Sequence, residues 1–292
     1  IRPTIMCSTF IDNDIEFVVY TQEDAIKYLK GKVRYGTLEH VKSTLTMDIF
    51  HNISEFANKG KYLGYLILQF IKSVINVLPI SDRDSYIYQR DICDAHAVDH
   101  IFNVEQPEIV IHMASFPRQK VVNANPALGS RVMSEGLLNL LEASNKYDVR
   151  KFIYMSSSMV YGDFTDDVTE DYDCKPQGQY GILKLTGEHL VKDYTRRGSF
   201  NHTIIRPSAV YGPLDVEDRV IAKFMLTAMR GGTLKVNGAS ETLDFTYVED
   251  AADGIVAASL SDNTENKTYN ITKSHSRTLL EAAQLALKLA GG

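Results

Sequence analysis

Cysteine and clustered basic residues are both scarce in this 292-residue sequence. Its three cysteines, Cys7, Cys93 and Cys174, lie far apart and outside any CxxC spacing. We therefore expect reduced thiols, as in a cytoplasmic protein, and no disulfide framework. The 37 acidic residues outnumber the 31 basic ones, which gives a formal net charge of -6. Because nucleic-acid-binding surfaces concentrate Lys and Arg, this balance argues against a nucleic-acid partner.

Long apolar runs are missing as well. No stretch of about 18 apolar residues is present, and residues 1–5 (IRPTI) lack the charged, apolar and small-residue sections of a signal peptide. We therefore expect a soluble protein without a membrane partner. Hydrophobic residues nevertheless make up 44% of the chain, which is enough for one large α/β domain or for a large domain carrying a small one.

Short β-branched runs alternate with amphipathic stretches from about residue 84 onward. This alternation is typical of βαβ units and predicts a parallel sheet, hence the α/β class. The helical stretches show apolar residues at three- and four-residue intervals. The predicted strands span residues 86–88, 109–112, 152–155 and 203–205, and the predicted helices span residues 95–103, 130–147, 180–197 and 278–289.

The first 80 residues are less regular. Residues 16–20 have the composition of a strand and residues 25–29 that of a capped helix. A second helix is predicted over residues 62–74, followed by a strand over residues 76–80. None of these segments forms the succession of strand, glycine-rich corner and helix.

A tyrosine and a lysine four residues apart open the predicted helix at 180–197. Tyr180 and Lys184 lie on the same helical face, so both reach one region of a substrate. A free tyrosine has a pKa of about 10, too high for a base at neutral pH, and a neighbouring ammonium lowers that pKa by stabilising the phenolate. The spacing therefore predicts a proton-transfer pair, although the same spacing also occurs on ordinary half-exposed helix faces.

Three serines, residues 156–158, directly follow the predicted strand at 152–155. They stand at the carboxyl end of a parallel strand, where open α/β sheets bind ligands. There Ser157 is placed to hydrogen-bond the substrate oxygen whose proton Tyr180 transfers. Serines after a strand are also common turn residues, so the prediction depends on their combination with Tyr180 and Lys184.

Seven segments, which include those serines and the tyrosine–lysine pair, follow one another in a characteristic order. They are residues 90–94 (RDICD), 106–115 (QPEIVIHMAS), 136–143 (GLLNLLEA), 156–162 (SSSMVYG), 180–188 (YGILKLTGE), 205–213 (IRPSAVYGP) and 244–250 (DFTYVED). In these segments the sequence resembles the extended short-chain dehydrogenase/reductase family, in particular its NAD-dependent epimerase and dehydratase group acting on sugar nucleotides. The resemblance covers about residues 84–292.

The resemblance implies a Rossmann-like, doubly wound parallel sheet with a smaller C-terminal substrate-binding region. It implies NAD as cofactor, with NADP as the alternative, and a nucleotide-sugar substrate. Tyr180 would be the catalytic acid/base, Lys184 would also hold the nicotinamide ribose, and Ser157 would complete the catalytic set. The remaining implied cofactor contacts are Asp91 and Ile92 beside the adenine, Ala114 and Ser115 along the pyrophosphate and ribose, and Pro207 beside the nicotinamide.

The N-terminal part departs from the family pattern of a strand followed by Gly-x-x-Gly-x-x-Gly, in which glycines bring the pyrophosphate to a helix N-terminus. In the nearest segment, residues 58–64, Gly64 keeps the expected register and Gly60 is offset, and both are candidates for the phosphate loop. Asp82 is a candidate acceptor of the adenosine ribose hydroxyls and favours NAD, whereas Arg83 is placed for the 2′-phosphate of NADP.

The substrate side departs from the pattern too. Leu243 replaces the family's arginine for the nucleotide diphosphate, so we expect Arg219 or Arg230 to serve instead. Family members that dehydrate or decarboxylate sugars carry acidic residues directly after the catalytic serine, where this chain has Ser158 and Met159. Without a carboxylate for a second proton transfer, both reactions are disfavoured against epimerisation or simple oxidoreduction. Ser158 and Arg219 are the candidate substrate-binding residues.

The domain organisation follows from the same resemblance. We place a dinucleotide-binding domain at residues 1–205, with residues 1–80 atypical, and a mainly substrate-binding region at residues 206–292. The abrupt end at Gly291 and Gly292 predicts a truncated or partly ordered C-terminus. The resemblance also predicts a homodimer packed through the helices at 130–147 and 180–197.

We interpret the sequence as an NAD-dependent epimerase of a nucleotide sugar, working through transient hydride transfer and a keto intermediate. An NAD(P)-dependent sugar dehydrogenase or ketoreductase is the alternative with the same fold. A cofactor-poor binding or scaffold relative is the alternative of another class, and the missing glycine loop motivates it. His96 and His100 lie one helical turn apart, but the sequence offers no third ligand, so no metal site is predicted.

Overall fold

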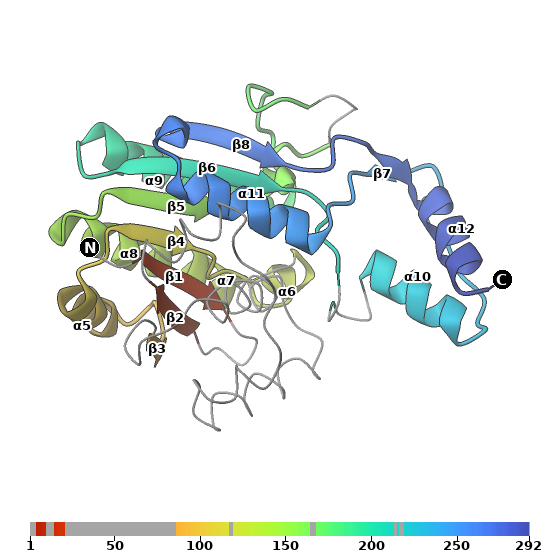
Figure 1. The fold of residues 1–292 in the computed structure, drawn as a ribbon, viewed down its shortest axis with the longest axis horizontal. Coiled ribbons are helices and arrows are strands. Elements are labelled where there is room, and N and C mark those ends of the chain that lie inside the picture. The colour runs from red at the N-terminus through yellow and green to blue at the C-terminus, as the bar shows by residue number, and fades with distance from the viewer. Residues whose placement is uncertain are drawn as a thin grey trace, which may run out of the picture.

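The structure, a computed structural model, describes residues 4–9, 15–20, 86–116, 119–163, 168–212, 215 and 219–291. Their centre is a sheet of seven strands in the order β3-β2-β1-β4-β5-β6-β8 (Figure 1). The strands are β1 (Thr4–Thr9), β2 (Ile15–Tyr20), β3 (Tyr86–Gln89), β4 (Ile109–His112), β5 (Lys151–Met155), β6 (Asn201–Pro207) and β8 (Lys267–Ile271). This order confirms the predicted α/β, Rossmann-like fold.

The strands from β1 through β4, β5 and β6 to β8 pair in parallel. Strand β2 differs, because it runs antiparallel to both β1 and β3. Only residues 10–14 separate β1 from β2, a spacing typical of antiparallel neighbours. One margin of the otherwise parallel sheet is therefore mixed.

Helices cover both faces of the sheet. Behind it in Figure 1 lie α8 (Leu137–Lys146) and α9 (Gly178–Arg196), with α5 (Ala95–Glu105) beside α8, whereas α11 (Val248–Leu260) lies in front. Strands β4 and β5 are buried at every position, as expected for parallel strands covered on both faces. The largest core cluster includes Phe152 and Tyr154 of β5 and Leu137, Leu140 and Val191 of the helices.

Helix α9 approaches strand β5 unusually closely at one point. A Cβ atom added at Gly187 of α9 would overlap the hydroxyl of Tyr154 on β5. Tyr154 is almost fully buried, and its hydroxyl donates to the carbonyl of Lys184 at 3.3 Å. Only glycine therefore permits this spacing between helix and strand.

The C-terminal region forms a smaller body beside the sheet (Figure 1). It contains α10 (Val220–Met229), α12 (Leu279–Leu289) and the short antiparallel strands β7 (Thr242–Leu243) and β9 (Arg277–Thr278). A separate small core around Phe224 and three alanines of α12 holds α10 against α12. Because β8 and α11 also come from this part of the chain, the segment after residue 206 contributes to both bodies.

Most predicted elements are confirmed within one to four residues. The strand predicted at 16–20 is β2, and the helix predicted at 180–197 is α9. The helix predicted at 130–147 is longer and interrupted, since α7 (Pro126–Ser130) leads through the π-helical segment η1 (Arg131–Gly136) into α8. Strand β1 was not predicted. The elements predicted over residues 25–29, 62–74 and 76–80 lie outside the described residues.

None of the described helices is long and apolar enough to cross a bilayer.

Candidate active site

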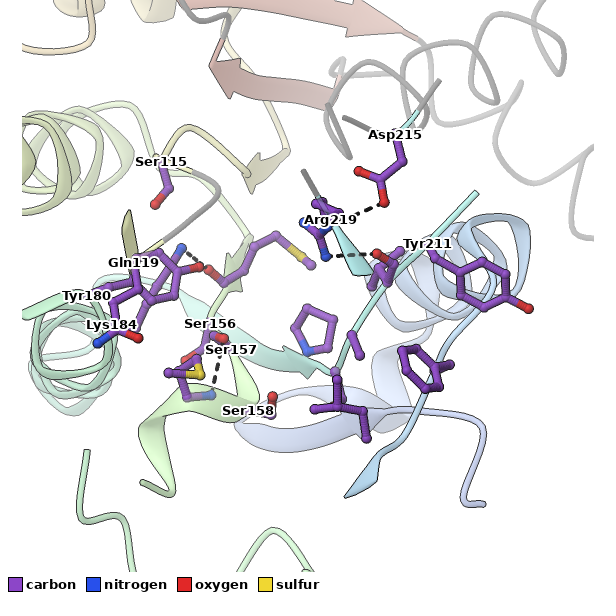
Figure 2. A pocket seen from close by; sticks show the side chains of 18 of the residues that line it. Ser115, Gln119, Ser156, Ser157, Ser158, Tyr180, Lys184, Tyr211, Asp215 and Arg219 are labelled. Carbon is purple, nitrogen blue, oxygen red and sulfur yellow. Dashed lines mark hydrogen bonds and ion pairs between the residues drawn. The ribbon is translucent and has the colours of Figure 1, made fainter. Parts of the chain in front are cut away.

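A cavity of about 450 Å³ opens at the carboxyl ends of β4, β5 and β6. Figure 2 shows Ser156, Ser157, Ser158, Tyr180 and Lys184 on one side of it, with Tyr211, Asp215 and Arg219 on the opposite side. Carboxyl ends of parallel strands are where open α/β sheets place their ligands. The cavity thus stands where the sequence predicted the site.

Ser157, two residues beyond β5, has an extended backbone and caps a short helical turn, η2 (Ser158–Val160). Its hydroxyl oxygen accepts a hydrogen bond from the backbone N–H of Met159 at 3.2 Å. The preceding residue, Ser156, donates its backbone N–H to the carbonyl of Ile205 at 2.7 Å, which ties the end of β5 to β6. The position of Ser157 is therefore fixed from both sides.

Tyr180 stands in the first turn of α9, and only 8% of it is exposed. Burial raises the pKa of its phenol to about 12, while a hydrogen bond with Ser157 and the positive charge of Arg219 act in the opposite direction. Ser157 and Tyr180 line the same cavity. In this state the phenol keeps its proton at neutral pH, so its use as a base requires an added positive charge nearby.

Lys184 lies one helical turn beyond Tyr180, and only 4% of it is exposed. Its Nζ donates to the backbone carbonyl of Met155 at 2.6 Å and lies 5.9 Å from the centre of the Tyr180 ring. Burial lowers the pKa of this ammonium to about 7, and the negative charge of Glu188 opposes that decrease. Lys184 therefore titrates in the neutral range, where a proton-transfer group is most useful.

The other predicted contacts divide into four groups. Ser115, Ser158, Pro207 and Arg219 line the cavity. Ala114 is buried just before Ser115. Asp91 and Ile92 lie beyond the end of β3 and do not line the cavity: Asp91 accepts from the N–H of Cys93, and Ile92 is fully buried against Gly136. Gly60, Gly64 and Asp82 are outside the described residues.

Among the described residues, Arg219 is the arginine that lines this cavity. Its Nη2 donates to the carbonyl of Val210 at 2.9 Å, and its Nε lies 3.3 Å from a carboxylate oxygen of Asp215. Leu243 also lines the cavity. Arg230, the other predicted substitute for the family arginine, ends α10 and is not among the lining residues. Of the two arginines, the structure thus brings Arg219 to the site.

The described residues fit the nicotinamide end of NAD, because Tyr180, Lys184, Ser115 and Pro207 surround one cavity. At the phosphate end, β1 is followed by antiparallel β2 instead of by a helix. A pyrophosphate is usually received where the first strand turns into a helix N-terminus, and among the described residues the element that follows β1 is a strand.

Several site residues were not predicted. Gln119, Tyr211 and Phe245 line the cavity. Tyr211 and Phe245 lie in the segments at 205–213 and 244–250, but the sequence assigned neither residue a role. Glu188 and Arg206 form a buried ion pair directly behind it. The Lys184–Glu188 spacing, a second repeat of four residues on the same helix face, was the available signal for Glu188.

The histidines of the described residues have simple surroundings. His96 and His100 are exposed on α5, and the described residues contain no group of three metal-ligating side chains. His112 packs beside Phe152 and Tyr154, and burial lowers its pKa to about 3. These rings indicate a packing role for His112.

Three comparisons with known proteins agree with this architecture. The model of the NAD dependent epimerase/dehydratase family matches residues 55–272. The chain is 28% identical over 236 residues to dTDP-D-glucose 4,6-dehydratase of Mus musculus, a match that covers 78% of this chain and 66% of that protein. The chain therefore spans just under two thirds of the length of that relative.

Two solved structures are similar in fold. The UDP-glucose 4-epimerase of Thermus thermophilus in complex with NAD superposes with a TM-score of 0.68 at 24% identity, covering 80% of this chain and 81% of that one. The UDP-glucuronic acid 4-epimerase of Bacillus cereus, in complex with UDP-glucuronic acid and NAD, gives a TM-score of 0.65 at 26% identity, covering 77% and 71%.

Proposed function

This chain belongs to the NAD-dependent epimerase/dehydratase family, and we propose that it epimerises a nucleotide sugar. The observation that carries the proposal is the convergence of Ser157, Tyr180 and Lys184 on one cavity at the carboxyl ends of the sheet. NAD⁺, when bound, supplies the acceptor that takes a hydride from a sugar carbon and returns it. All other steps fall to side chains of this chain.

Tyr180 removes the proton from the sugar hydroxyl during oxidation and returns it during reduction. Ser157, which lines the same cavity as Tyr180, orients the reacting oxygen. Lys184 in its charged form favours the phenolate and so opposes the increase that burial causes in the pKa of this phenol. The oxidised sugar is planar at the reacting carbon, so a turn within the cavity exposes its other face to the returning hydride.

The choice of epimerisation over dehydration rests on the acidic groups near the cavity. Loss of water needs a group that protonates the departing hydroxyl, in addition to Tyr180. Among the described lining residues the only carboxylate is Asp215, and it lies against Arg219. Ser158 and Met159, which follow Ser157, supply no acid.

A nucleotide sugar suits the opposite side of the cavity. Arg219 offers a positive charge for a diphosphate, and aromatic and aliphatic side chains surround it. Those neighbours are Tyr211, Ile221, Leu243 and Phe245. Ser158, on the catalytic side, is placed for a sugar hydroxyl.

The domain boundary near residue 205 and a homodimer packed through α8 and α9 stay predictions. Leu138 of α8 and Ile182 of α9 expose apolar surface, at 37% and 50%, which such a contact would cover. Cytoplasmic localisation also stays a prediction.

The test is a product analysis with UDP- and dTDP-hexoses in the presence of NAD⁺. We expect NMR to show interconversion of two epimers without a stoichiometric rise in absorbance at 340 nm, because the hydride returns to the sugar. Tyr180→Phe is expected to abolish turnover while the circular dichroism spectrum stays unchanged.

Each other result identifies a different function. A stoichiometric change at 340 nm indicates a dehydrogenase or ketoreductase, and a 4-keto-6-deoxy product indicates a dehydratase. Absence of calorimetric binding by both NAD and NADP would contradict the enzymatic proposal and favour a scaffold relative. Activity of Tyr180→Phe within a few-fold of wild type would refute the role of this residue.

A further inference from the structure

A buried carboxylate links the three elements that carry the active site. Glu188 of α9 is fully buried, and its Oε1 accepts from the hydroxyl of Ser156 at 2.5 Å and from Nε of Arg206 at 2.8 Å. Its Oε2 accepts from Nη2 of Arg206 at 2.6 Å. The two parallel bonds make a bidentate pair, the most directional contact between these side chains.

Each partner of Glu188 stands next to a residue of the proposed site. Ser156 precedes Ser157 at the end of β5, and Arg206 precedes Pro207 at the end of β6. Lys184 lies one helical turn before Glu188 on α9. Glu188 itself does not line the cavity, so it acts on the reaction through these neighbours.

Arg206 is anchored beyond Glu188 as well. Its Nη1 donates to the hydroxyl of Tyr161 at 2.9 Å and to the backbone carbonyl of Glu170 at 3.1 Å. Tyr161 in turn donates to Asn270 of β8 at 2.7 Å. Because this chain of bonds fixes Arg206, it also fixes the place of the Glu188 carboxylate.

We propose that Glu188 is a positioning residue, whose buried carboxylate holds the ends of β5 and β6 against α9 and keeps a negative charge behind Lys184. The proposal deepens the function above and rests on its assignment of Lys184 as the partner of Tyr180. Replacing a buried ion pair by apolar groups is often neutral for stability, so stability alone gives little reason for this pair. A functional reason for a charged residue at this position is that its negative charge keeps Lys184 protonated.

The electrostatic surroundings decide how the carboxylate acts. Burial favours the neutral form of Lys184, and the charge of Glu188 counteracts this effect. Removing that charge therefore moves the titration of Lys184 to lower pH, and the phenolate of Tyr180 loses its stabilising ammonium. Among the described residues, the titratable groups that interact with Glu188 are Arg206, Lys184, Lys192, Tyr154, Cys174 and His202. Those that interact with Lys184 are Glu188 and His112, and the rings of Tyr154 and Tyr180 lie beside its ammonium.

The experiment compares Glu188→Gln with wild type by NMR titration of protein labelled at the lysine ε-carbon. Lys184→Met identifies the Lys184 signal by its loss. We expect a wild-type midpoint near pH 7 and a midpoint lower by about a pH unit or more in Glu188→Gln. Glu142→Gln is the control. Glu142 of α8 accepts a hydrogen bond from Tyr194 of α9, the helix that carries Glu188, and no contact within the described chain joins Glu142 to Lys184.

Kinetics supply the second readout. With the substrate found in the product analysis, we expect Glu188→Gln to lower kcat by about 10- to 100-fold while KM stays within about threefold, because the residue touches neither substrate nor cofactor. Glu142→Gln is expected to keep both constants. A purely structural role would lower the melting temperature and leave the NMR midpoint and the kcat-to-KM pattern unchanged.

A second variant keeps the proposal testable if Glu188→Gln does not fold. Glu188→Gln combined with Arg206→Met removes both charges and leaves no unpaired guanidinium, and the Lys184 midpoint is again expected to fall. A Lys184 midpoint within about 0.3 pH units of wild type in either folded variant overturns the proposal. The NMR readout needs neither cofactor nor substrate, so failure of the proposed function cannot be mistaken for failure of this inference.

Discussion

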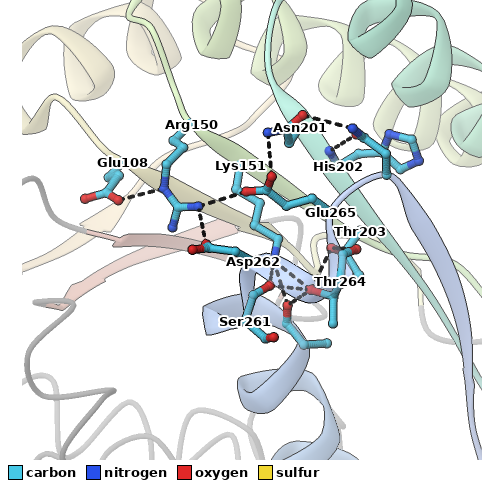
Figure 3. Close-up of polar contacts among 12 residues, drawn as sticks. Glu108, Arg150, Lys151, Asn201, His202, Thr203, Ser261, Asp262, Thr264 and Glu265 are labelled. Carbon is cyan, nitrogen blue, oxygen red and sulfur yellow. Dashed lines mark hydrogen bonds and ion pairs between the residues drawn. The ribbon is translucent and has the colours of Figure 1, made fainter.

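Two buried lysines lie at opposite ends of the central strands and differ in their hydrogen bonds: Lys151 begins β5, and Lys184 of α9 lies beside the carboxyl end of β5. At the amino end of β5, Nζ of Lys151 donates to the carbonyls of Ala258 and Ser261 at 2.9 and 2.6 Å and to the hydroxyl of Thr264 at 2.7 Å (Figure 3). At the carboxyl end, Lys184 donates within the described chain to Met155 alone. An ammonium has three donors, so the first lysine is saturated by the protein and the second is not.

This difference separates a structural lysine from a functional one. Burial lowers the pKa of both, to about 8 for Lys151 and to about 7 for Lys184. A shifted pKa by itself therefore does not identify the site. What distinguishes Lys184 is that it lines a cavity and has donors left for a ligand.

The neighbours of Lys151 extend the contrast. Arg150 contacts the carboxylates of Glu108, Asp262 and Glu265 at 2.8 to 3.0 Å (Figure 3). Together these two cations fasten the segment after α11 to the sheet. The amino end of the sheet is thus closed by protein groups, whereas the carboxyl end leaves room for other molecules.

The largest expected effect is on catalysis. Lys184→Met should lower kcat/KM by about 10²- to 10⁴-fold, the range typical of losing assistance to an acid/base, whereas Lys151→Met should leave it within about threefold. Both constants come from the epimerase assay. Equal losses in the two variants would mean that the two ends of the sheet do not differ in function.

A smaller effect is expected on stability, and here Lys151→Met should lose more than Lys184→Met. Lys151→Met removes three hydrogen bonds of a buried ammonium, to the carbonyls of Ala258 and Ser261 and to the Thr264 hydroxyl, and should lower the free energy of unfolding by about 2–4 kcal/mol. Lys184→Met removes one such bond and should cost about 1 kcal/mol. Urea denaturation followed by circular dichroism measures both, and a greater loss in Lys184→Met would reverse the comparison.

The smallest effect is in the pH dependence of stability. A lysine whose pKa is lowered in the folded state is protonated more fully in the unfolded chain, so stability rises with pH above the folded pKa. The rise in stability that Lys184 causes begins near pH 7, and the rise that Lys151 causes begins near pH 8. Between about pH 7 and 8, the free energy of unfolding of wild type and of Lys151→Met should each rise by up to about 1 kcal/mol through Lys184, an increase that Lys184→Met lacks. Parallel slopes for all three proteins in urea denaturation would contradict this assignment.

The central part of the fold was predictable because local pattern and burial agree there. Strand β4 coincides with the predicted residues 109–112, an apolar run enclosed on both faces. Strand β1 was missed, because its sequence, TIMCST, mixes small polar residues with apolar ones and forms a strand through pairing with the distant β4. The π-helical segment η1 was also missed, since apolar spacing does not reveal a local change of hydrogen-bond register.

The site was predictable where several of its residues share one element or one motif. Tyr180 and Lys184 lie on a single helix, and Ser157 follows a recognisable strand. The pairing of Glu188 on α9 with Arg206 on β6 joins residues 18 positions apart, and local spacing contains no information about it. The phosphate side of the cofactor depends on residues 58–64 and 82, where the predictions remain predictions.

The absence of a side chain at Gly187 limits how this protein can be redesigned. Since α9 rests on the Tyr154 hydroxyl at that position, any side chain there would push the helix away from β5 and separate Tyr180 from Ser157. An engineer who wants to admit a bulkier sugar must therefore leave the helix in place. The residues to vary are Val210, Ile221 and Leu243 on the opposite wall, which come from the strand-following loop and the smaller C-terminal body.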